Sequence, residues 1–158
     1  MANPLRQLLR PKSAADFTAQ LVANGEIKTA LDIGCGTSSH LSRFRPKVET
    51  TGLDAHHDAI DLAKERDVHN HYIEADILQD NINAQFDLVT LYGLIEHLPK
   101  TDGFRLLDRI EKLSSKFIFL ETPNGFVPQG PEFGNEFQRH HSGWFIHEFE
   151  GRGYTVYG

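Results

Sequence analysis

A short apolar run, broken by one acid and closed by two glycines, constrains the fold of this chain most strongly. Residues 29–37 read T-A-L-D-I-G-C-G-T. The apolar run around Asp32 predicts a buried strand, and Gly34 and Gly36 predict a tight turn before a helix. Such a turn lets a ligand approach free backbone amides at the helix N-terminus. The sequence therefore predicts a nucleotide-type ligand site here.

Asp32 indicates which kind of ligand this turn accepts. In dinucleotide sites of the G-x-G-x-x-G type the preceding strand is apolar and the turn holds a pyrophosphate. A carboxylate that close to a diphosphate would cost about 2–4 kcal/mol at an effective dielectric of about 20. Ser39 also stands where the third glycine of that motif would lie. The acid suits a nucleoside with an ammonium group and no phosphate, such as S-adenosylmethionine. An NAD(P)-dependent oxidoreductase is the alternative, because it would share the strand and helix pattern.

Length and composition predict one globular domain. The chain has 158 residues, and we expect an N-terminal arm over 1–12 and one domain over 13–158. The net charge of −6 weighs against a nucleic-acid partner, which a basic face would attract. The absence of a long apolar run or a signal-like N-terminus predicts a cytoplasmic protein without a membrane partner. The single cysteine, Cys35, excludes an internal disulfide and is interpreted as a small residue that fills space in the turn.

Strand and helix candidates alternate along the chain. This alternation predicts an α/β fold, a Rossmann-like doubly wound sheet that is mostly parallel and has helices on both faces. Gly- and Pro-rich residues 125–142 predict a long loop, which is typically functional. The predicted strands are 27–33, 48–53, 72–75, 86–92, 117–120 and 154–157, and the predicted helices are 13–24, 38–44, 57–66, 102–113 and 144–149.

Two further acids stand at the ends of predicted strands. Asp54 closes the second strand, where a carboxylate accepts hydrogen bonds from the ribose hydroxyls of an adenosine. Asp76 closes the third strand, where it would accept from the adenine amino group while Ile77 packs on the ring. The alternative for each acid is a role as a helix N-cap or turn residue.

Four successive motifs resemble those of the class I S-adenosylmethionine-dependent methyltransferases, in particular the group with the ubiquinone-biosynthesis enzymes. They read L-D-I-G-C-G-T, G-L-D-A, E-A-D-I and F-D-L-V-T-L-Y-G-L-I-E-H-L, within a similarity that covers 14–157. The resemblance implies S-adenosyl-L-methionine as cofactor and in-line methyl transfer to an O, N or C atom of a small-molecule acceptor. A non-catalytic cofactor-binding subunit is a further alternative. The resemblance places the cofactor against Asp32, Gly34, Cys35, Gly36, Asp54, Ala55, Asp76, Ile77, Tyr92 and Gly93.

Two histidines are the candidate catalytic residues. His97 follows the strand 86–92 beside Glu96, at the edge where the family's acceptor pocket opens, and the pKa of a histidine suits removal of a proton near neutral pH. His140 lies in the segment 138–144, Q-R-H-H-S-G-W, which is expected to return to the top of the sheet. The alternative for both is a pocket wall or a structural contact. The spacing of Glu136, His140, His141 and His147 matches no strong ligand pattern, so no metal site is predicted.

The end of the chain departs from the family's pattern. The family's sheet usually has seven strands, the last antiparallel, whereas the sequence ends just after a predicted sixth strand. We therefore expect either a C-terminally truncated domain or a sheet completed in another way. A second chain on the exposed edge, giving a homodimer, is one such way. A strand drawn from residues 1–10 would contradict this expectation.

Overall fold

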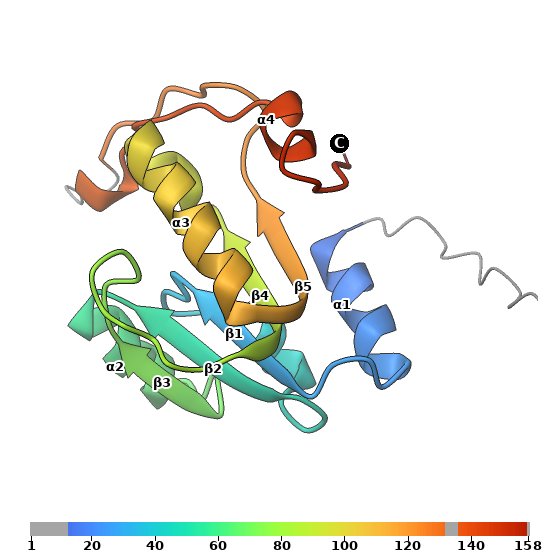
Figure 1. Ribbon diagram of the computed structural model, residues 1–158. Coiled ribbons are helices and arrows are strands. Elements are labelled where there is room, and N and C mark those ends of the chain that lie inside the picture. Colours follow the sequence, from blue (N-terminus) through green and yellow to red (C-terminus); the bar gives the residue numbers. More distant parts are fainter. Residues whose placement is uncertain (1–12, 132–135, 158) are drawn as a thin grey trace, which may run out of the picture.

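A five-stranded sheet forms the centre of the protein (Figure 1). The computed structural model describes residues 13–131 and 136–157, so the predicted arm over 1–12 lies outside the described residues. All strands pair in parallel in the order β3-β2-β1-β4-β5, which confirms the Rossmann-like prediction. The strand order reverses between β1 and β4, where ligands bind in such sheets. The strands are β1 (Thr29–Ile33), β2 (Glu49–Asp54), β3 (His71–Glu74), β4 (Phe86–Tyr92) and β5 (Ser114–Glu121).

Helices cover the sheet as the alternating pattern predicts. α3 packs against β4 and β5, α2 against β2 and β3, and α1 lies beside β5 (Figure 1). Ser13 caps α1 by accepting a hydrogen bond from the Asp16 amide. The α-helices are α1 (Ala14–Ala23), α2 (His57–Glu65), α3 (Lys100–Leu113) and α4 (Ile146–Glu150), and the 3₁₀ turns are η1 (His40–Phe44), η2 (Ile95–His97) and η3 (Glu136–Gln138).

Alternation along β1 separates two apolar cores. Leu31 and Ile33 join the core beneath α3, whereas Ala30 joins the core beneath α1 and η1. Because successive side chains of a strand point to opposite faces, Asp32 lies on the same face as Ala30. The acid is therefore placed on the η1 side of the sheet, next to the glycine turn.

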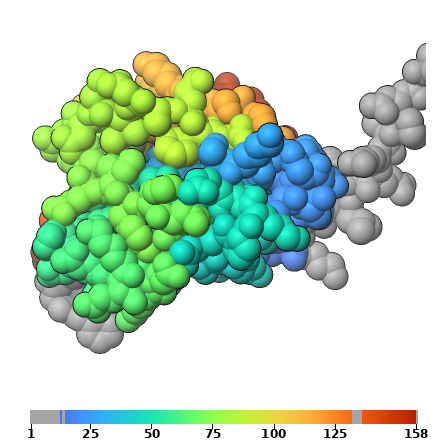
Figure 2. All heavy atoms as spheres, turned by 90° about the horizontal axis from the view of Figure 1, so that it is seen from below, coloured from blue at the N-terminus to red at the C-terminus, as the bar shows by residue number. Residues whose placement is uncertain are grey.

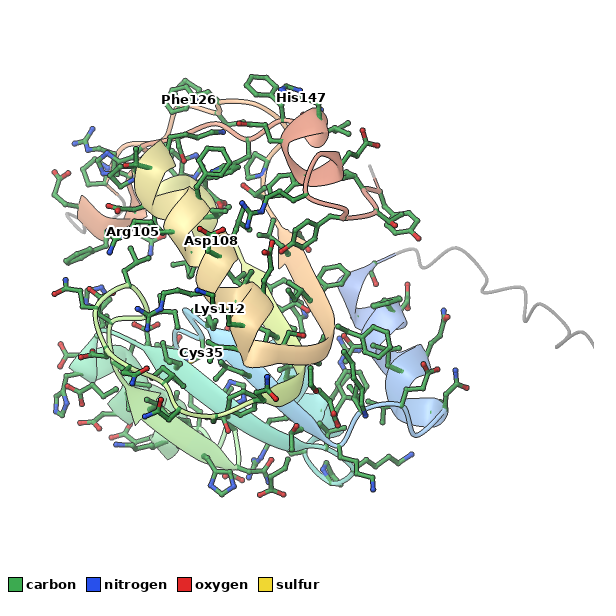
Figure 3. All side chains as sticks on the ribbon, viewed as in Figure 1. Cys35, Arg105, Asp108, Lys112, Phe126 and His147 are labelled. Atoms are coloured by element: carbon green, nitrogen blue, oxygen red, sulfur yellow. The ribbon has the colours of Figure 1, made fainter. Side chains whose placement is uncertain are left out.

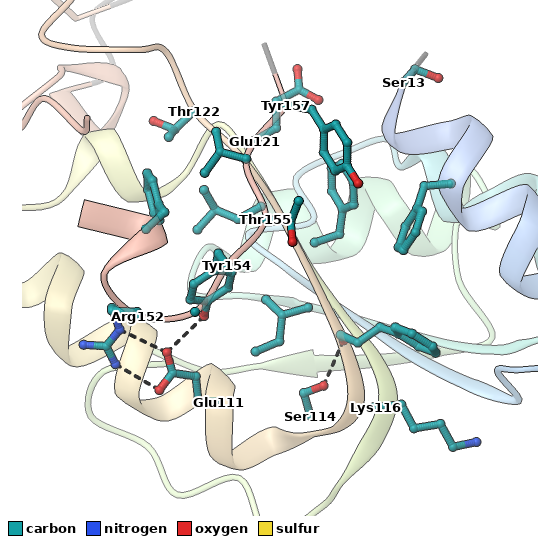
Figure 4. Close-up of a pocket in the computed structure, with 18 of the residues that line it drawn as sticks. Ser13, Glu111, Ser114, Lys116, Glu121, Thr122, Arg152, Tyr154, Thr155 and Tyr157 are labelled. Carbon is teal, nitrogen blue, oxygen red and sulfur yellow. Dashed lines mark hydrogen bonds and ion pairs between the residues drawn. The ribbon is translucent and has the colours of Figure 1, made fainter. Parts of the chain in front are cut away.

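Two predicted elements differ from the structure. The predicted helix 38–44 is only the five-residue 3₁₀ turn η1. The segment between its N-cap Ser39 and Pro46 is too short for an α-helix. The predicted strand 154–157 is not a strand, so the sheet has five described strands and not six. The Tyr154 amide donates to the Phe149 carbonyl and the Tyr154 hydroxyl donates to Glu111 of α3, at 3.1 Å each (Figure 4). These contacts fold the segment against α3 and α4 instead of pairing it with β5.

A large groove follows the edge of β5. Its volume is about 1520 Å³, and β5, α1 and residues 152–157 line it (Figure 4). Phe17 of α1 contacts Phe117 and Phe119 on its wall, with ring centroids 6.3 and 6.0 Å apart. The face in Figure 2 is formed mainly by the cyan to yellow-green segments from β2 to β4, with α1 at its side. In the described ranges no helix has the length and apolar character that a membrane crossing requires.

The long loop after β5 is closed at its base. The Gly125 amide donates to the Trp144 carbonyl at 2.6 Å, and both Asn124 and Gly125 form isolated bridges with Trp144. Trp144 is buried against Gly103 in the first turn of α3, where a Cβ atom would overlap the Trp144 ring, so a glycine is required there. Because Trp144 anchors this base, the last helix begins at Ile146, two residues later than predicted.

Candidate functional site

The glycine turn after β1 is held in place by the end of β2. Gly34 and Gly36 have φ angles of +68° and +55°, which residues with a side chain rarely adopt. The amides of Gly34 and Cys35 donate to the Leu53 carbonyl at 2.8 and 3.1 Å. The carboxylate of Asp54 accepts from the Gly36 amide at 2.9 Å. The acid predicted to contact ribose therefore also fixes the shape of the turn.

Asp32 is a buried carboxylate with two hydroxyl donors. The residue is 3% exposed, and its carboxylate accepts from the hydroxyls of Ser39 at 2.5 Å and Thr90 at 2.7 Å. Burial raises the pKa of Asp32 from 3.8 to about 6, although these hydrogen bonds favour the charged form. At neutral pH the carboxylate is therefore ionised at a free-energy cost, which a neighbouring cation would reduce.

His69 and Cys35 fill the space behind Asp32. A Cβ atom on Gly52 of β2 would lie 2.5 Å from His69 Cδ2 and 2.9 Å from Cys35 Sγ, so glycine is required there. Burial lowers the pKa of His69 to about 4, so its approach of 3.7 Å to Asp32 is not an ion pair at neutral pH. Burial and the carboxylate of Asp32 raise the pKa of the Cys35 thiol to about 12. The thiol is therefore protonated at neutral pH, in keeping with the space-filling interpretation.

A cavity of about 420 Å³ opens at the glycine turn. It brings an acid, tight-turn backbone and aromatic rings together at the carboxyl end of β1. The ring centroids of His40 and Tyr92 are 5.1 Å apart, and burial raises the pKa of Tyr92, so its hydroxyl is protonated. This combination can hold an organic cation with an apolar body. The lining residues are Asp32, Gly34, Cys35, Ser38, Ser39, His40 and Tyr92.

The contacts of Asp76 and Ile77 are local. Asp76 accepts from the Leu78 amide and from Gln79 Nε2, at 2.8 Å each, and so caps the turn after β3. Ile77 is 7% exposed and packs in the core beneath α3. The structure therefore gives Asp76 the turn-capping contact that the sequence left open as an alternative.

Ala55 and Gly93 lie at the ends of β2 and β4. Both are exposed, and Gly93 has a φ angle of +58°. The residue after Ala55, His56, donates its amide to Asp54 at 2.9 Å. The predicted cofactor residues thus share one edge of the sheet, but of these only Asp32, Gly34, Cys35 and Tyr92 line the 420 Å³ cavity.

Glu96, His97 and His140 come together next to this edge, although the histidines are 43 positions apart. The ring centroids of His97 and His140 are 4.8 Å apart. Each residue of the trio offers a ligand atom, and these atoms lie within 4.8 Å of one another. Glu96 is 5% and His140 9% exposed, while His97 is half-buried. Of the four residues considered for a metal from their spacing, only His140 belongs to this cluster.

The rest of the 138–144 segment is structural. Trp144 Nε1 donates to Ser142 Oγ at 2.9 Å, and Lys100 of α3 lies 3.7 Å from the Trp144 ring centroid. Arg139 forms an ion pair with Glu136 at 2.9 Å. The Arg139 guanidinium is therefore already paired with a carboxylate.

Sequence reasoning missed the two hydroxyl donors to Asp32. Thr90 lies directly opposite Asp32 in the register of β1 and β4, and Ser39 is the N-cap of η1. A usable signal was Thr90 within the apolar stretch 88–92 of β4, because a polar residue in a buried strand needs a partner.

Fold and cavity define the class of protein: a doubly wound α/β domain with a buried carboxylate in the cavity at its switch point. Residues 30–115, more than half of the chain, match the family described as "Methyltransferase domain". The chain therefore belongs to this methyltransferase family.

Individual relatives agree with this family. The chain is 31% identical over 104 residues to a ubiquinone biosynthesis O-methyltransferase of Alkalilimnicola ehrlichii, an alignment that covers 61% of this chain and 39% of the relative. Among solved structures, the plantazolicin methyltransferase BpumL has a TM-score of 0.64 at 22% identity, covering 85% of this chain and 58% of that one. The magnesium protoporphyrin IX methyltransferase of Synechocystis PCC 6803 has a TM-score of 0.59 at 19% identity, covering 73% and 58%. The chain thus spans well under half of the curated relative.

Proposed function

We propose that this protein transfers a methyl group from S-adenosyl-L-methionine to a small-molecule acceptor. The observation that carries the proposal is the buried Asp32 at the wall of the 420 Å³ cavity, beside the positive-φ turn at Gly34 and Gly36. A carboxylate there favours the ammonium group of a methionine moiety and repels a pyrophosphate. The SAM-bound structure of the Synechocystis methyltransferase supports the same cofactor.

The residues around the cavity suit this cofactor. Asp32 would bind the ammonium group of the methionine moiety, and the glycine turn would contact the atoms next to it. The Asp54 carboxylate accepts from the Gly36 amide and still has oxygen lone pairs that can accept from the ribose hydroxyls. The adenine contact of Asp76 and Ile77 stays a prediction, as do those of Ala55, Cys35, Tyr92 and Gly93. The bound sulfonium supplies a methyl carbon that is already activated for displacement. The protein's part is alignment and exclusion of water, which are worth several kcal/mol of barrier.

An acceptor that must lose a proton would find His97 and His140 near the end of β4. Each ring uses Nδ1 to contact a backbone carbonyl, that of Arg139 at 3.2 Å and that of Val127 at 2.7 Å. An imidazole whose Nδ1 donates a proton keeps the lone pair of Nε2 free. The free Nε2 atoms are the groups we propose to face the acceptor.

Calorimetric titration with S-adenosylhomocysteine, NAD⁺ and NADP⁺ tests the cofactor. We expect binding of S-adenosylhomocysteine and none of either dinucleotide, and the reverse would refute the proposal in favour of an oxidoreductase. Transfer of labelled methyl from S-adenosylmethionine to a metabolite extract then tests catalysis. Cofactor binding without turnover, at any extract concentration, would indicate a non-catalytic cofactor-binding subunit.

The wider organisation of the protein is also proposed. We place one domain over 13–158, a cytoplasmic location, and no nucleic-acid or membrane partner, in line with the net charge of −6. A homodimer through the open edge of β5 would cover the groove along that strand. Sedimentation analysis tests the dimer, and a monomer at micromolar concentration would refute it.

A further inference from the structure

The cluster of Glu96, His97 and His140 has the composition of a metal site. It contains two imidazoles and one carboxylate whose ligand atoms lie within 4.8 Å of one another. Around a tetrahedral ion with bonds of about 2.1 Å, ligand atoms stand about 3.4 Å apart. Side-chain rotations that shorten the longest separation from 4.8 Å by about 1.4 Å would therefore complete the geometry.

The two histidines are held in the tautomer that binds metals. The Nδ1 atoms of His97 and His140 contact the carbonyls of Arg139 and Val127, acceptors that take a hydrogen bond only from a protonated nitrogen. In the neutral ring the proton is thereby placed on Nδ1, and Nε2 then keeps the lone pair. Metal-binding histidines are typically oriented in this way, with the second nitrogen donating to a carbonyl or carboxylate. The ring centroids are 4.8 Å apart, so both rings lie close enough together to contribute one nitrogen each to a single ion.

Glu96 supplies a buried negative charge. Its residue is 5% exposed, and one carboxylate oxygen accepts from the Thr122 hydroxyl at 3.0 Å. Within residues 13–131 and 136–157, no lysine or arginine forms an ion pair with this carboxylate. Buried carboxylates are ordinarily paired with a cation or bound to a metal. The Thr122 bond orients one oxygen and leaves the other available as a ligand.

The backbone fixes the trio from both sides. The Glu96 carbonyl accepts from the amides of His141 at 2.8 Å and Ser142 at 3.1 Å, so η2 and the segment after His140 are tied together. The base of the loop, where Gly125 bonds to Trp144, lies only a few residues further along the chain. The three ligand residues therefore sit on backbone that is hydrogen-bonded, as a preorganised site requires.

We propose that Glu96, His97 and His140 bind one divalent transition-metal ion, with Zn²⁺ the best match. Two imidazoles and one carboxylate suit Zn²⁺, Co²⁺ or Fe²⁺ better than Mg²⁺ or Ca²⁺, which prefer all-oxygen sites. Three protein ligands leave at least one coordination position open, as in catalytic zinc sites. The role of the open position rests on the proposed function: it would receive an oxygen or nitrogen of the methyl acceptor. The ion then occupies the Nε2 lone pairs that an unmetallated protein would offer as bases.

Co²⁺ binding is the direct test, because its visible absorption reports the ligand set. Chelator-treated protein is titrated with CoCl₂ and, by calorimetry, with ZnCl₂. We expect one ion per chain, and we expect Glu96→Gln, His97→Gln and His140→Gln each to weaken binding by at least about 100-fold. His147→Gln is the matched control, since His147 is exposed on the outer side of α4 (Figure 3), and it is expected to bind as the wild type does.

Three results would overturn the proposal. They are the absence of stoichiometric Co²⁺ binding by the wild type, equal binding by the wild type and Glu96→Gln, and an equal loss in His147→Gln. Thermal unfolding checks that each variant is folded. If Glu96→Gln does not fold, metal binding by His97→Gln, at the half-buried position, decides the test instead. S-adenosylhomocysteine is titrated in parallel without metal. Metal binding without cofactor binding would refute the proposed function alone, and cofactor binding without metal binding would refute the cation site alone.

Discussion

Replacing Asp32 by asparagine should make the protein more stable and at the same time unable to hold its cofactor. The pKa of Asp32 is raised from 3.8 to about 6, mainly by burial. A shift of about 2 pKa units corresponds to about 3 kcal/mol of lost stability for the ionised group. Asparagine has the same shape and no charge, and it can still accept from Thr90. We expect a gain of about 1–3 kcal/mol at pH 7.5, or roughly 3–10 °C in melting temperature.

The pH dependence of this gain gives the sign of the effect. Because the folded-state pKa of Asp32 lies above the unfolded one, folded protein holds the extra proton between pH 3.8 and about 6. Wild-type stability is therefore lost as pH rises through this window, and the variant escapes that loss. Denaturant unfolding at pH 4 and pH 7.5 measures it: the two proteins should be nearly equal at pH 4 and differ at pH 7.5.

Cofactor binding should change in the opposite direction. A carboxylate and an ammonium about 4 Å apart attract by about 4 kcal/mol at an effective dielectric of about 20. We expect Asp32→Asn to weaken S-adenosylhomocysteine binding at least about 100-fold, and wild-type affinity to fall as pH drops below about 6 because the acid becomes protonated.

Asp87→Asn is the matched control, an aspartate on the neighbouring strand. Burial alone would raise the pKa of Asp87, but hydrogen bonds from the Lys28 amide and from Lys116 outweigh burial and lower it. Its stabilising contribution is present at neutral pH and is lost on acidification, so this variant should be less stable at pH 7.5 and bind cofactor normally. The reasoning is refuted if Asp32→Asn binds S-adenosylhomocysteine within threefold of wild type, or is the less stable protein at pH 7.5.

Three further predictions follow from other contacts. Gly103→Ala should lower the free energy of unfolding by about 1–3 kcal/mol, because its Cβ would overlap the Trp144 ring, and unchanged urea unfolding would contradict this packing. Cys35, with its pKa raised to about 12, should react with a maleimide far more slowly in native than in unfolded protein at pH 7.5, as mass spectrometry would show; equal rates would argue against its burial. Ser39→Ala removes a hydrogen bond to the charged form of Asp32, so the pKa of Asp32 should rise. The pH below which S-adenosylhomocysteine binding is lost should therefore move upward. A downward shift of this pH would contradict the assignment of Ser39 as donor and Asp32 as acceptor.

Local patterns were enough to predict the glycine turn, the acid before it and the parallel sheet. They failed where pairing between distant segments decides. Residues 154–157 read Y-T-V-Y, which is typical of a strand, yet Tyr154 bonds to Glu111 and Phe149, and no described segment pairs with the outer edge of β5. Strand propensity describes a half-buried surface and not the presence of a partner.

In the site, too, features set by neighbouring residues were predicted, and features set by distant segments were not. Asp32 was predicted because its neighbours in sequence define its place. The donor Thr90 was not, since it lies 58 positions away and meets Asp32 only through the register of β1 and β4. The approach of His97 to His140 likewise depends on the course of the loop after β5, for which no periodic pattern exists.

The closed base of that loop has a consequence for how this fold diversifies. Gly125 and Trp144 join the two ends of the excursion, so a longer or shorter stretch between them would leave β5 and α4 where they are. Doubling the length of a flexible loop costs only about 0.6 kcal/mol of closure entropy. The stretch between Gly125 and Trp144 can therefore change in length or sequence while the sheet and the cavity at the glycine turn keep their structure.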